Sequence, residues 1–166
     1  MIKLDYRLHE SWSRKAGEVP DFALVSRHFL VFHALGGGQI IKGDEYDCSL
    51  MDVYVPILYF AGVLFNRVAL LRASSEETML YSLDENFKLH LVLAERVVIL
   101  EEIDDDDECT GQGKCTYEEL MVASSDYAKR VLADAIQMHP RLAMNQTLPE
   151  IYPVAELGLE HLLISP

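Results

Sequence analysis

The spacing of the apolar residues changes along this chain, and this change constrains the fold more than any other feature of the sequence. From Pro56 onward, spacings of four, three, four and three residues place the apolar positions on one helical stripe, made of Ile57, Ala61, Leu64, Val68 and Leu71. Pro56 suits a first helical turn, because its missing N–H would have no partner there. The pattern predicts a long helix over about residues 56–72.

Period two, which is typical of strands with one buried face, occurs on both sides of this helix. Residues 2–8 alternate strictly and predict an N-terminal strand. Three further runs, at 78–83, 87–93 and 96–103, are separated by short connections. Strands this close in sequence pair as an antiparallel meander.

A hairpin is expected between these regions. The segment from Phe22 to Leu35 is rich in β-branched and aromatic residues and leads into Gly36–Gly38, which we expect to form the turn. A phosphate-binding loop would lead from a strand into a helix, whereas Ile40-Ile41 and another turn follow here. The glycines therefore favour a turn over a phosphate site.

A second helix is signalled by its first residues. Thr116 and Glu119 have the spacing of a capping box, and the apolar periodicity that follows runs to about Met138, before Pro140. The fold class is therefore α+β: an antiparallel sheet, made of the N-terminal strand, the hairpin and the meander, packs against two long helices at about 56–72 and 117–138.

The first helix is apolar on more than one side, since Tyr59, Phe60, Val63 and Leu70 lie off its main stripe. Such a helix is covered on several faces, either by strands of its own chain or by another chain. A homodimer or other structural module in which helix 56–72 packs across a two-fold axis is one reading of this pattern.

The length and composition predict a single domain over residues 1–166, because 166 residues with 50% apolar content can bury one sizeable core. Two segments stand apart from it. Residues 104–115 are expected to form a mobile acidic loop, since like charges repel and stay solvated. Residues 140–166 are expected to dock on the body through an apolar set that includes Val154, Leu157 and Leu159.

The charge excludes some partners and favours others. Fourteen Lys and Arg stand against 27 Asp and Glu, so the net charge of −13 repels nucleic acid and anionic membranes and attracts basic proteins. The most apolar run, residues 53–65, is too short to cross a bilayer. Three cysteines and no secretory-type start predict a reducing, cytoplasmic location.

The acidic loop has two metal readings, and neither fits well. No register of residues 104–115 matches a twelve-residue calcium loop, which needs Gly at position six and Glu at twelve. Cys109 and Cys115 are separated by more residues than zinc sites usually show, and the loop has no His. A disulfide between these two cysteines, or a metal-dependent protein that uses this loop, stays an alternative. No cofactor is expected.

The same segment offers a binding surface. Seven acidic residues precede and enter the loop, and an acidic flank of this kind suits a positively charged groove on a partner. The candidate partner-binding residues are Glu101, Glu102, Asp104, Asp105, Asp106, Asp107 and Glu108.

Catalytic patterns are not found. His28 and His33 lie on the predicted strand, five residues apart and hence on opposite faces, so they are not expected to share a metal or a proton. Acidic neighbours should raise the pKa of Cys48 rather than lower it. The single tryptophan, Trp12, is either a loop anchor or an interface residue. We expect a protein that is not an enzyme.

The order of elements carries a resemblance. The segments V-P-I-L-Y-F-A-G-V-L-F (55–65), V-V-I-L (97–100), T-Y-E-E-L (116–120) and H-P-R-L-A-M-N (139–145) resemble those of small uncharacterised bacterial proteins of the toxin-immunity type. The resemblance implies a cytosolic inhibitor that binds and neutralises a cognate basic toxin domain, for example a nuclease. It transfers no active-site residue to this chain.

Overall fold

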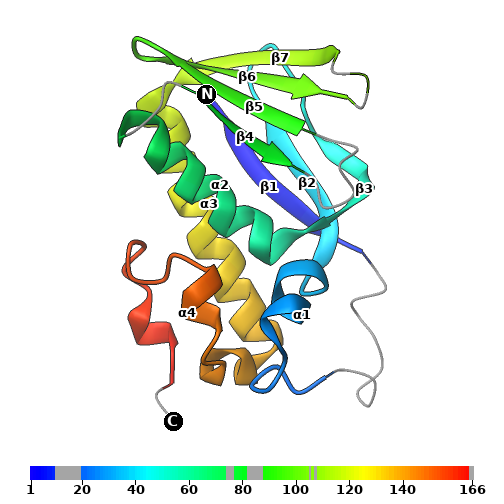
Figure 1. Cartoon of the computed structure of the whole chain (residues 1–166), viewed down its shortest axis with the longest axis vertical. Coiled ribbons are helices and arrows are strands. Elements are labelled where there is room, and N and C mark those ends of the chain that lie inside the picture. The colour runs from blue at the N-terminus through cyan, green and yellow to red at the C-terminus, as the bar shows by residue number, and fades with distance from the viewer. Residues whose placement is uncertain (10–19, 74–76, 82–87, 105, 107, 165–166) are drawn as a thin grey trace.

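The strands form two separate antiparallel sheets in the computed structural model, which describes residues 1–9, 20–73, 77–81, 88–104, 106 and 108–164 (Figure 1). The first sheet has the order β1 (Lys3–Leu8), β2 (Gly36–Lys42), β3 (Leu50–Pro56). The second is a meander of β4 (Glu77–Tyr81), β5 (Lys88–Ala94), β6 (Val97–Ile103) and β7 (Cys109–Thr116). The predicted α+β class is confirmed, but the expected single sheet is divided in two.

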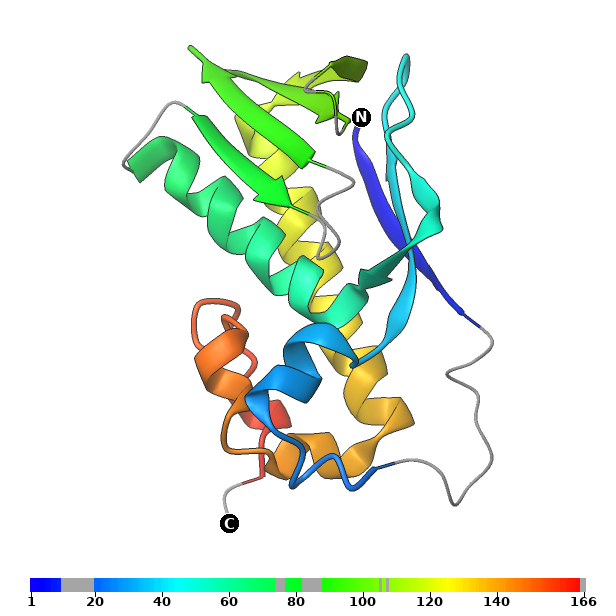
Figure 2. The same cartoon turned by 45° about the vertical axis from the view of Figure 1, so that its right-hand side comes forward.

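Two long helices support both sheets. α2 (Ile57–Ala73) and α3 (Tyr117–Met138) pack against each other; α2 also contacts β2 to β5, and α3 contacts β1, β6 and β7 (Figure 2). The shorter helices α1 (Arg27–Phe32), α4 (Leu148–Ile151), η2 (Pro140–Met144) and η3 (Glu160–Leu162) gather at the end of the molecule farthest from the second sheet. Buried side chains from both sheets, α2, α3 and the C-terminal segment form one hydrophobic cluster.

α2 begins one residue later than its pattern predicts, because Pro56 is the last residue of β3. The N–H of Ile57 donates to the carbonyl of Leu35, at 3.0 Å. The faces that are apolar in sequence are covered by α3, by β4 and β5 and by α1, all from the same chain. Most of the apolar surface of α2 is thus covered within one chain, while Leu70 is exposed. Among the described residues, no helix has the length and apolarity needed to cross a membrane.

The predicted hairpin over Phe22–Leu35 and Gly36–Gly38 is wrong. Ser26 caps a short helix instead, its Oγ accepting the N–H of Phe29 at 3.2 Å. The glycines form the start of β2, where a Cβ on Gly37 would overlap the carbonyl oxygen of Arg7 in β1. Close approach of two strands, not a turn, is what requires glycine there.

The capping box at the start of α3 is confirmed. The Thr116 Oγ1 accepts the N–H of Glu119 at 3.1 Å, and the Glu119 carboxylate accepts the N–H of Thr116 at 3.0 Å. The helix runs to Met138, as its periodicity predicts. Its buried face includes Leu120, Tyr127, Val131 and Ala135, while Met138 is exposed.

The prediction of a loop over residues 104–115 is wrong for its second half. Residues 109–116 form β7, which pairs with β6 along its length. The strand escapes a propensity reading because its sequence, C-T-G-Q-G-K-C-T, has no β-branched or aromatic run. Tertiary pairing with β6 decides its conformation, with a bulge near Ile103.

The segment after α3 lies on the body of the protein. Leu142, Leu148 and Tyr152 are buried, and the Tyr152 hydroxyl donates to the Ala128 carbonyl of α3 at 2.5 Å. The Asn145 side chain donates to the carbonyl of Phe22, at 2.8 Å. These contacts hold the C-terminal segment against α3 and against the residues that precede α1.

Candidate partner-binding surface

The turn that joins β6 to β7 is closed by its first carboxylate. Asp104 Oδ1 accepts the N–H groups of Asp106, at 3.0 Å, and Glu108, at 2.9 Å, while its own N–H donates to the Glu108 carbonyl at 3.0 Å. The side chains of Asp106 and Glu108 are exposed. Asp105 and Asp107 lie outside the described residues. A self-capped turn of this kind presents its acids in a defined arrangement.

Glu101 and Glu102 do not share a surface with each other. Consecutive residues of a strand point to opposite faces. Glu101 lies on the outer face, where its carboxylate contacts His90 Nδ1 at 3.0 Å and accepts the Gln112 side-chain N–H at 3.0 Å. Glu102 points to the inner face, half-buried near Asp47. Glu101 and Glu102, two of the seven predicted residues, therefore lie on opposite faces of the sheet.

The structure adds a second acidic segment, which the sequence analysis missed. The turn from β2 to β3 carries Asp44, Glu45 and Asp47, and it packs against β7 through the ring of Tyr46. A Cβ on Gly43 or on Gly113 would overlap that ring. The two glycines thus let one aromatic side chain join the two sheets.

We group the acidic residues of these two turns with Glu102 of β6 and call the set the acidic rim. Its described members are Asp44, Glu45, Asp47, Glu102, Asp104, Asp106 and Glu108. Burial raises the pKa of Glu102, and the neighbouring Asp47 raises it further. Asp47 of the first turn and Glu102 of β6 are thus close enough to interact, although 55 positions of sequence separate them.

Few cations compensate the acidic rim. The N-terminal amine lies 2.6 Å from Asp44, and Lys42 lies 2.8 Å from Asp47. Hydrogen bonds from Lys42 and Ser49 lower the pKa of Asp47. Within the described part of the chain, no ion pair reaches the other rim members, which are Glu45, Glu102, Asp104, Asp106 and Glu108. Among the described residues, the rim therefore has more acidic groups than ion-paired cations, and Lys114 lies beside Asp44 and Glu45.

An open depression of about 470 Å³ lies beside the rim. Its lining includes the N-terminal residue, Asp44, Glu45, Tyr46 and Lys114. The Tyr46 hydroxyl is buried and has no hydrogen-bond partner among the described residues. The lining of this depression thus carries both signs of charge, since Lys114 and the N-terminal amine lie beside Asp44 and Glu45.

The prediction about the two neighbouring histidines differs from the structure. His28 and His33 lie on and just after α1, with ring centroids 5.6 Å apart, so the prediction that they point to opposite faces of a strand is wrong. A helix rises 1.5 Å per residue, whereas a strand would separate them by about 16 Å. Among the described residues, no group of three His, Cys, Asp or Glu is arranged to hold a metal ion.

The two cysteines of the acidic segment are held apart. Cys109 and Cys115 are the first and seventh residues of β7, and at 3.3 Å per residue an extended strand places them about 20 Å from each other. Neither a shared zinc ion nor a disulfide joins them in this arrangement. Cys48 is buried, and burial, followed by Glu102 and Asp47, raises its pKa to about 11.

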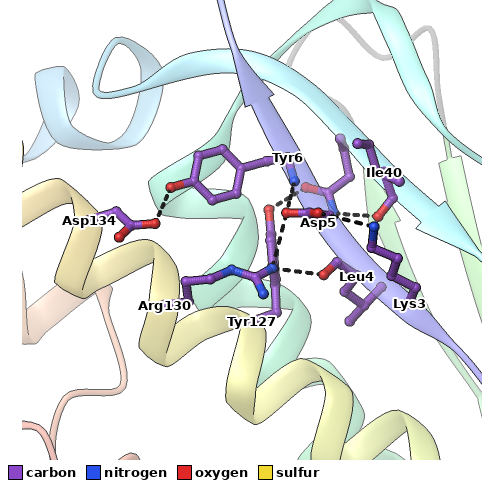
Figure 3. A network of polar contacts seen from close by, with 9 residues as sticks. Lys3, Leu4, Asp5, Tyr6, Ile40, Tyr127, Arg130 and Asp134 are labelled. Carbon is purple, nitrogen blue, oxygen red and sulfur yellow. Dashed lines mark hydrogen bonds and ion pairs between the residues drawn. The ribbon is translucent and has the colours of Figure 1, made fainter.

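A separate polar network joins β1 to α3 (Figure 3). The Tyr127 hydroxyl donates to the buried Gln39 side chain, and the Tyr6 hydroxyl donates to Asp134 at 2.7 Å. Burial is the main cause that raises the pKa of both tyrosines, so both stay protonated. The sequence pattern did not predict this network, because Asp134 reads as a solvent-facing helix position.

The network also covers the outer edge of β1. Arg130 donates to the Leu4 carbonyl at 2.9 Å and to the Asp5 carboxylate at 3.2 Å, and Asp5 accepts the N–H of Tyr6 at 3.0 Å (Figure 3). An open strand edge invites pairing with another chain, and polar side chains prevent this. The network therefore fits a structural role. Trp12 lies outside the described residues.

Comparisons with known proteins add no relative. No protein-family model matches the chain, no curated protein matches it, and no solved structure matches it. The resemblance to toxin-immunity proteins stays a prediction, and the function has to be argued from the surface itself.

Proposed function

We propose that this protein is a non-enzymatic, acidic binding protein of the immunity type, which engages a cognate basic toxin domain through the acidic rim. One observation carries the proposal: an acidic turn of the first sheet packs against β7 of the second, Asp47 lies close enough to Glu102 to raise its pKa, and two ion pairs reach these acids among the described residues. A surface of one sign attracts a partner of the opposite sign over distances of several ångströms and accelerates association.

Contacts that hold the two acidic turns in fixed conformations support the same proposal. The Asp104 carboxylate closes one turn, and the Tyr46 ring holds the other against Gly113. Binding to a surface that is already arranged costs less conformational entropy than binding to a flexible chain. Such a rim mimics the row of phosphates that a nuclease recognises, so a nucleic-acid-cleaving toxin domain is the partner class favoured by charge.

The test first searches the neighbouring genes for a basic toxin domain and then titrates the chain with that purified domain at about 50 and 300 mM salt; absence of any such gene would count against the proposal. The rim variant is Glu45→Gln/Asp106→Asn/Glu108→Gln, which leaves the turn-closing Asp104 in place. We expect Kd to rise by about tenfold or more at the lower salt, mainly through slower association.

The matched control removes the same number of charges elsewhere, as Asp126→Asn/Glu150→Gln/Glu156→Gln. These three side chains are exposed on α3, on α4 and in the C-terminal segment. We expect less than a threefold change. Equal effects of the two variants would mean that net charge alone acts, and unchanged affinity of the rim variant would contradict the proposal.

A further inference from the structure

Three reactive side chains meet around one glycine of β7. The position that a Cβ would take on Gly111 lies 3.1 Å from the Glu102 carboxylate and 3.8 Å from Cys48 Sγ. Cys109 Sγ donates to the carbonyl oxygen of the same glycine, at 3.4 Å. The Cys48 and Cys109 thiols also interact electrostatically. The fold thus brings together two cysteines that are 61 positions apart in sequence.

The two thiols face the same glycine, and joining them requires rotation of both side chains together with a shift of the backbone near Cys109. Since the Cβ and carbonyl oxygen of one residue lie about 3 Å apart, the two contacts place the sulfur atoms within about 10 Å of each other. Rotation about χ1 moves each Sγ by up to about 3 Å. Gly111 has no side chain to fill the space between them, and Cys109 follows directly after a turn.

We infer that Cys48 and Cys109 form a peroxide-responsive thiol pair that closes to a disulfide and links the β2–β3 turn to β7. The inference is independent of the proposed function, since it concerns neither the partner nor its affinity. It also replaces the pairing of Cys109 with Cys115, which β7 holds about 20 Å apart.

The reaction has two balanced steps. The exposed Cys109 thiolate attacks a hydroperoxide: an S–O bond forms, the O–O bond breaks, and sulfur loses two electrons to the departing oxygen, which leaves as water or an alcohol. Cys48 then attacks the sulfenic sulfur: the S–S bond forms, the S–O bond breaks, and hydroxide leaves as water with the proton of Cys48.

Glu102 is placed to assist the second step. Its carboxylate lies at the same glycine as Cys48, and its raised pKa makes it a better proton acceptor than an ordinary surface carboxylate. Burial raises the pKa of Cys48 to about 11, so this thiol keeps its proton until the sulfenic acid forms nearby. The exposed thiol therefore reacts first and the buried one second.

The experiment treats the reduced, full-length protein with equimolar hydrogen peroxide in the presence of EDTA, followed by denaturation in N-ethylmaleimide and mass spectrometry. The chain has three cysteines, so the reduced protein takes up three labels. We expect oxidation to lower the uptake to one label and to yield one cross-linked peptide pair that contains Cys48 and Cys109.

Variants assign the roles of the two thiols. Cys48→Ser should stop the reaction at the Cys109 sulfenic acid, which dimedone traps, and Cys109→Ser should leave the remaining thiols reduced. Cys115→Ser, a buried cysteine of the same strand, is the matched control and should retain the full cross-link. A cross-link between two chains, or oxidation of Cys109 beyond the sulfenic acid while Cys48 remains labelled, would overturn the inference.

Discussion

At the scale of single residues, buried polar groups define positions that apolar packing alone would leave open. Gln39 is fully buried in β2, and its side-chain oxygen is satisfied by the Tyr127 hydroxyl of α3. A buried amide without a partner is costly, so this pair favours one placement of the helix against the first sheet.

Tyr127→Phe should therefore lower the free energy of unfolding by about 1–3 kcal/mol, because the Gln39 amide loses its partner. Urea denaturation followed by circular dichroism measures the change. The double variant Tyr127→Phe/Gln39→Leu should recover part of the loss, since both polar groups are then gone. If the single and double variants are equally unstable, the hydrogen bond is not the cause.

The raised pKa of Glu102 predicts that the stability of the folded protein depends on pH, and it fixes the sign of that dependence. A carboxyl whose pKa is higher in the folded state than its value of 4.5 in the unfolded chain favours folding only while it is protonated. The contribution is complete below pH 4.5 and is lost as pH rises through the folded pKa.

Glu102→Gln should consequently be more stable than the unaltered protein at pH 7, and the difference should disappear below about pH 4.5. Unfolding midpoints in urea across pH 4–8 measure it. Glu101→Gln is the control on the opposite face, where the substitution removes a carboxylate that contacts His90 and Gln112. A gain that persists unchanged at pH 4 would rule out ionisation as its source.

At the scale of elements, local signals and tertiary contacts have different weight in different segments. The sequence of α3 has local signals for a helix both at its start and along its length: a capping box at Thr116 and apolar periodicity to its end. The structure confirms this helix. β7 has almost no local preference for a strand, and its pairing with β6 decides its conformation. Segments of the second kind are the ones that sequence reasoning misses.

Thr116→Ala tests the local signal at the start of α3. It removes the hydroxyl that accepts the Glu119 N–H and should cost about 0.5–2 kcal/mol of stability. Thr110→Ala should cost less, because Thr110 is an exposed residue of the same strand, β7, and its hydroxyl makes only a 3.5 Å contact with the Glu102 carbonyl. Chemical denaturation of both variants makes the comparison, and equal losses would show that the cap contributes little.

At the scale of the whole molecule, the junction between the two sheets is the feature that organises the surface. The ring of Tyr46 lies between Gly43 and Gly113, and through it the acidic turn of the first sheet packs against β7 of the second. Without this junction, the β2–β3 turn would lose its contact with the second sheet.

Gly113→Val should disturb the junction directly, because a branched side chain there overlaps the Tyr46 ring. We expect a loss of about 1–3 kcal/mol in unfolding free energy, as overpacking typically costs, and a changed environment of the tyrosine in near-ultraviolet circular dichroism. Gly111→Ala is the milder control, since its Cβ meets mainly the flexible Glu102 carboxylate at 3.1 Å. Full stability of the valine variant would contradict the described packing.

By itself, the sequence determined the elements whose signals are local and periodic. The N-terminal strand, the two long helices and three strands of the meander follow from periods of 2 and 3.6 residues, since one buried face imposes that repeat. Composition likewise determined the acidic character of the surface.

Only the tertiary structure decided what lies beside what. It divided the strands between two sheets, made Gly36–Gly38 part of a strand, separated Glu101 from Glu102 and placed the 44–47 turn against β7. It also brought Cys48, rather than Cys115, close to Cys109. Each of these depends on contacts between residues far apart in sequence. Such contacts produce no periodic pattern in a single sequence, so they could not be predicted from it.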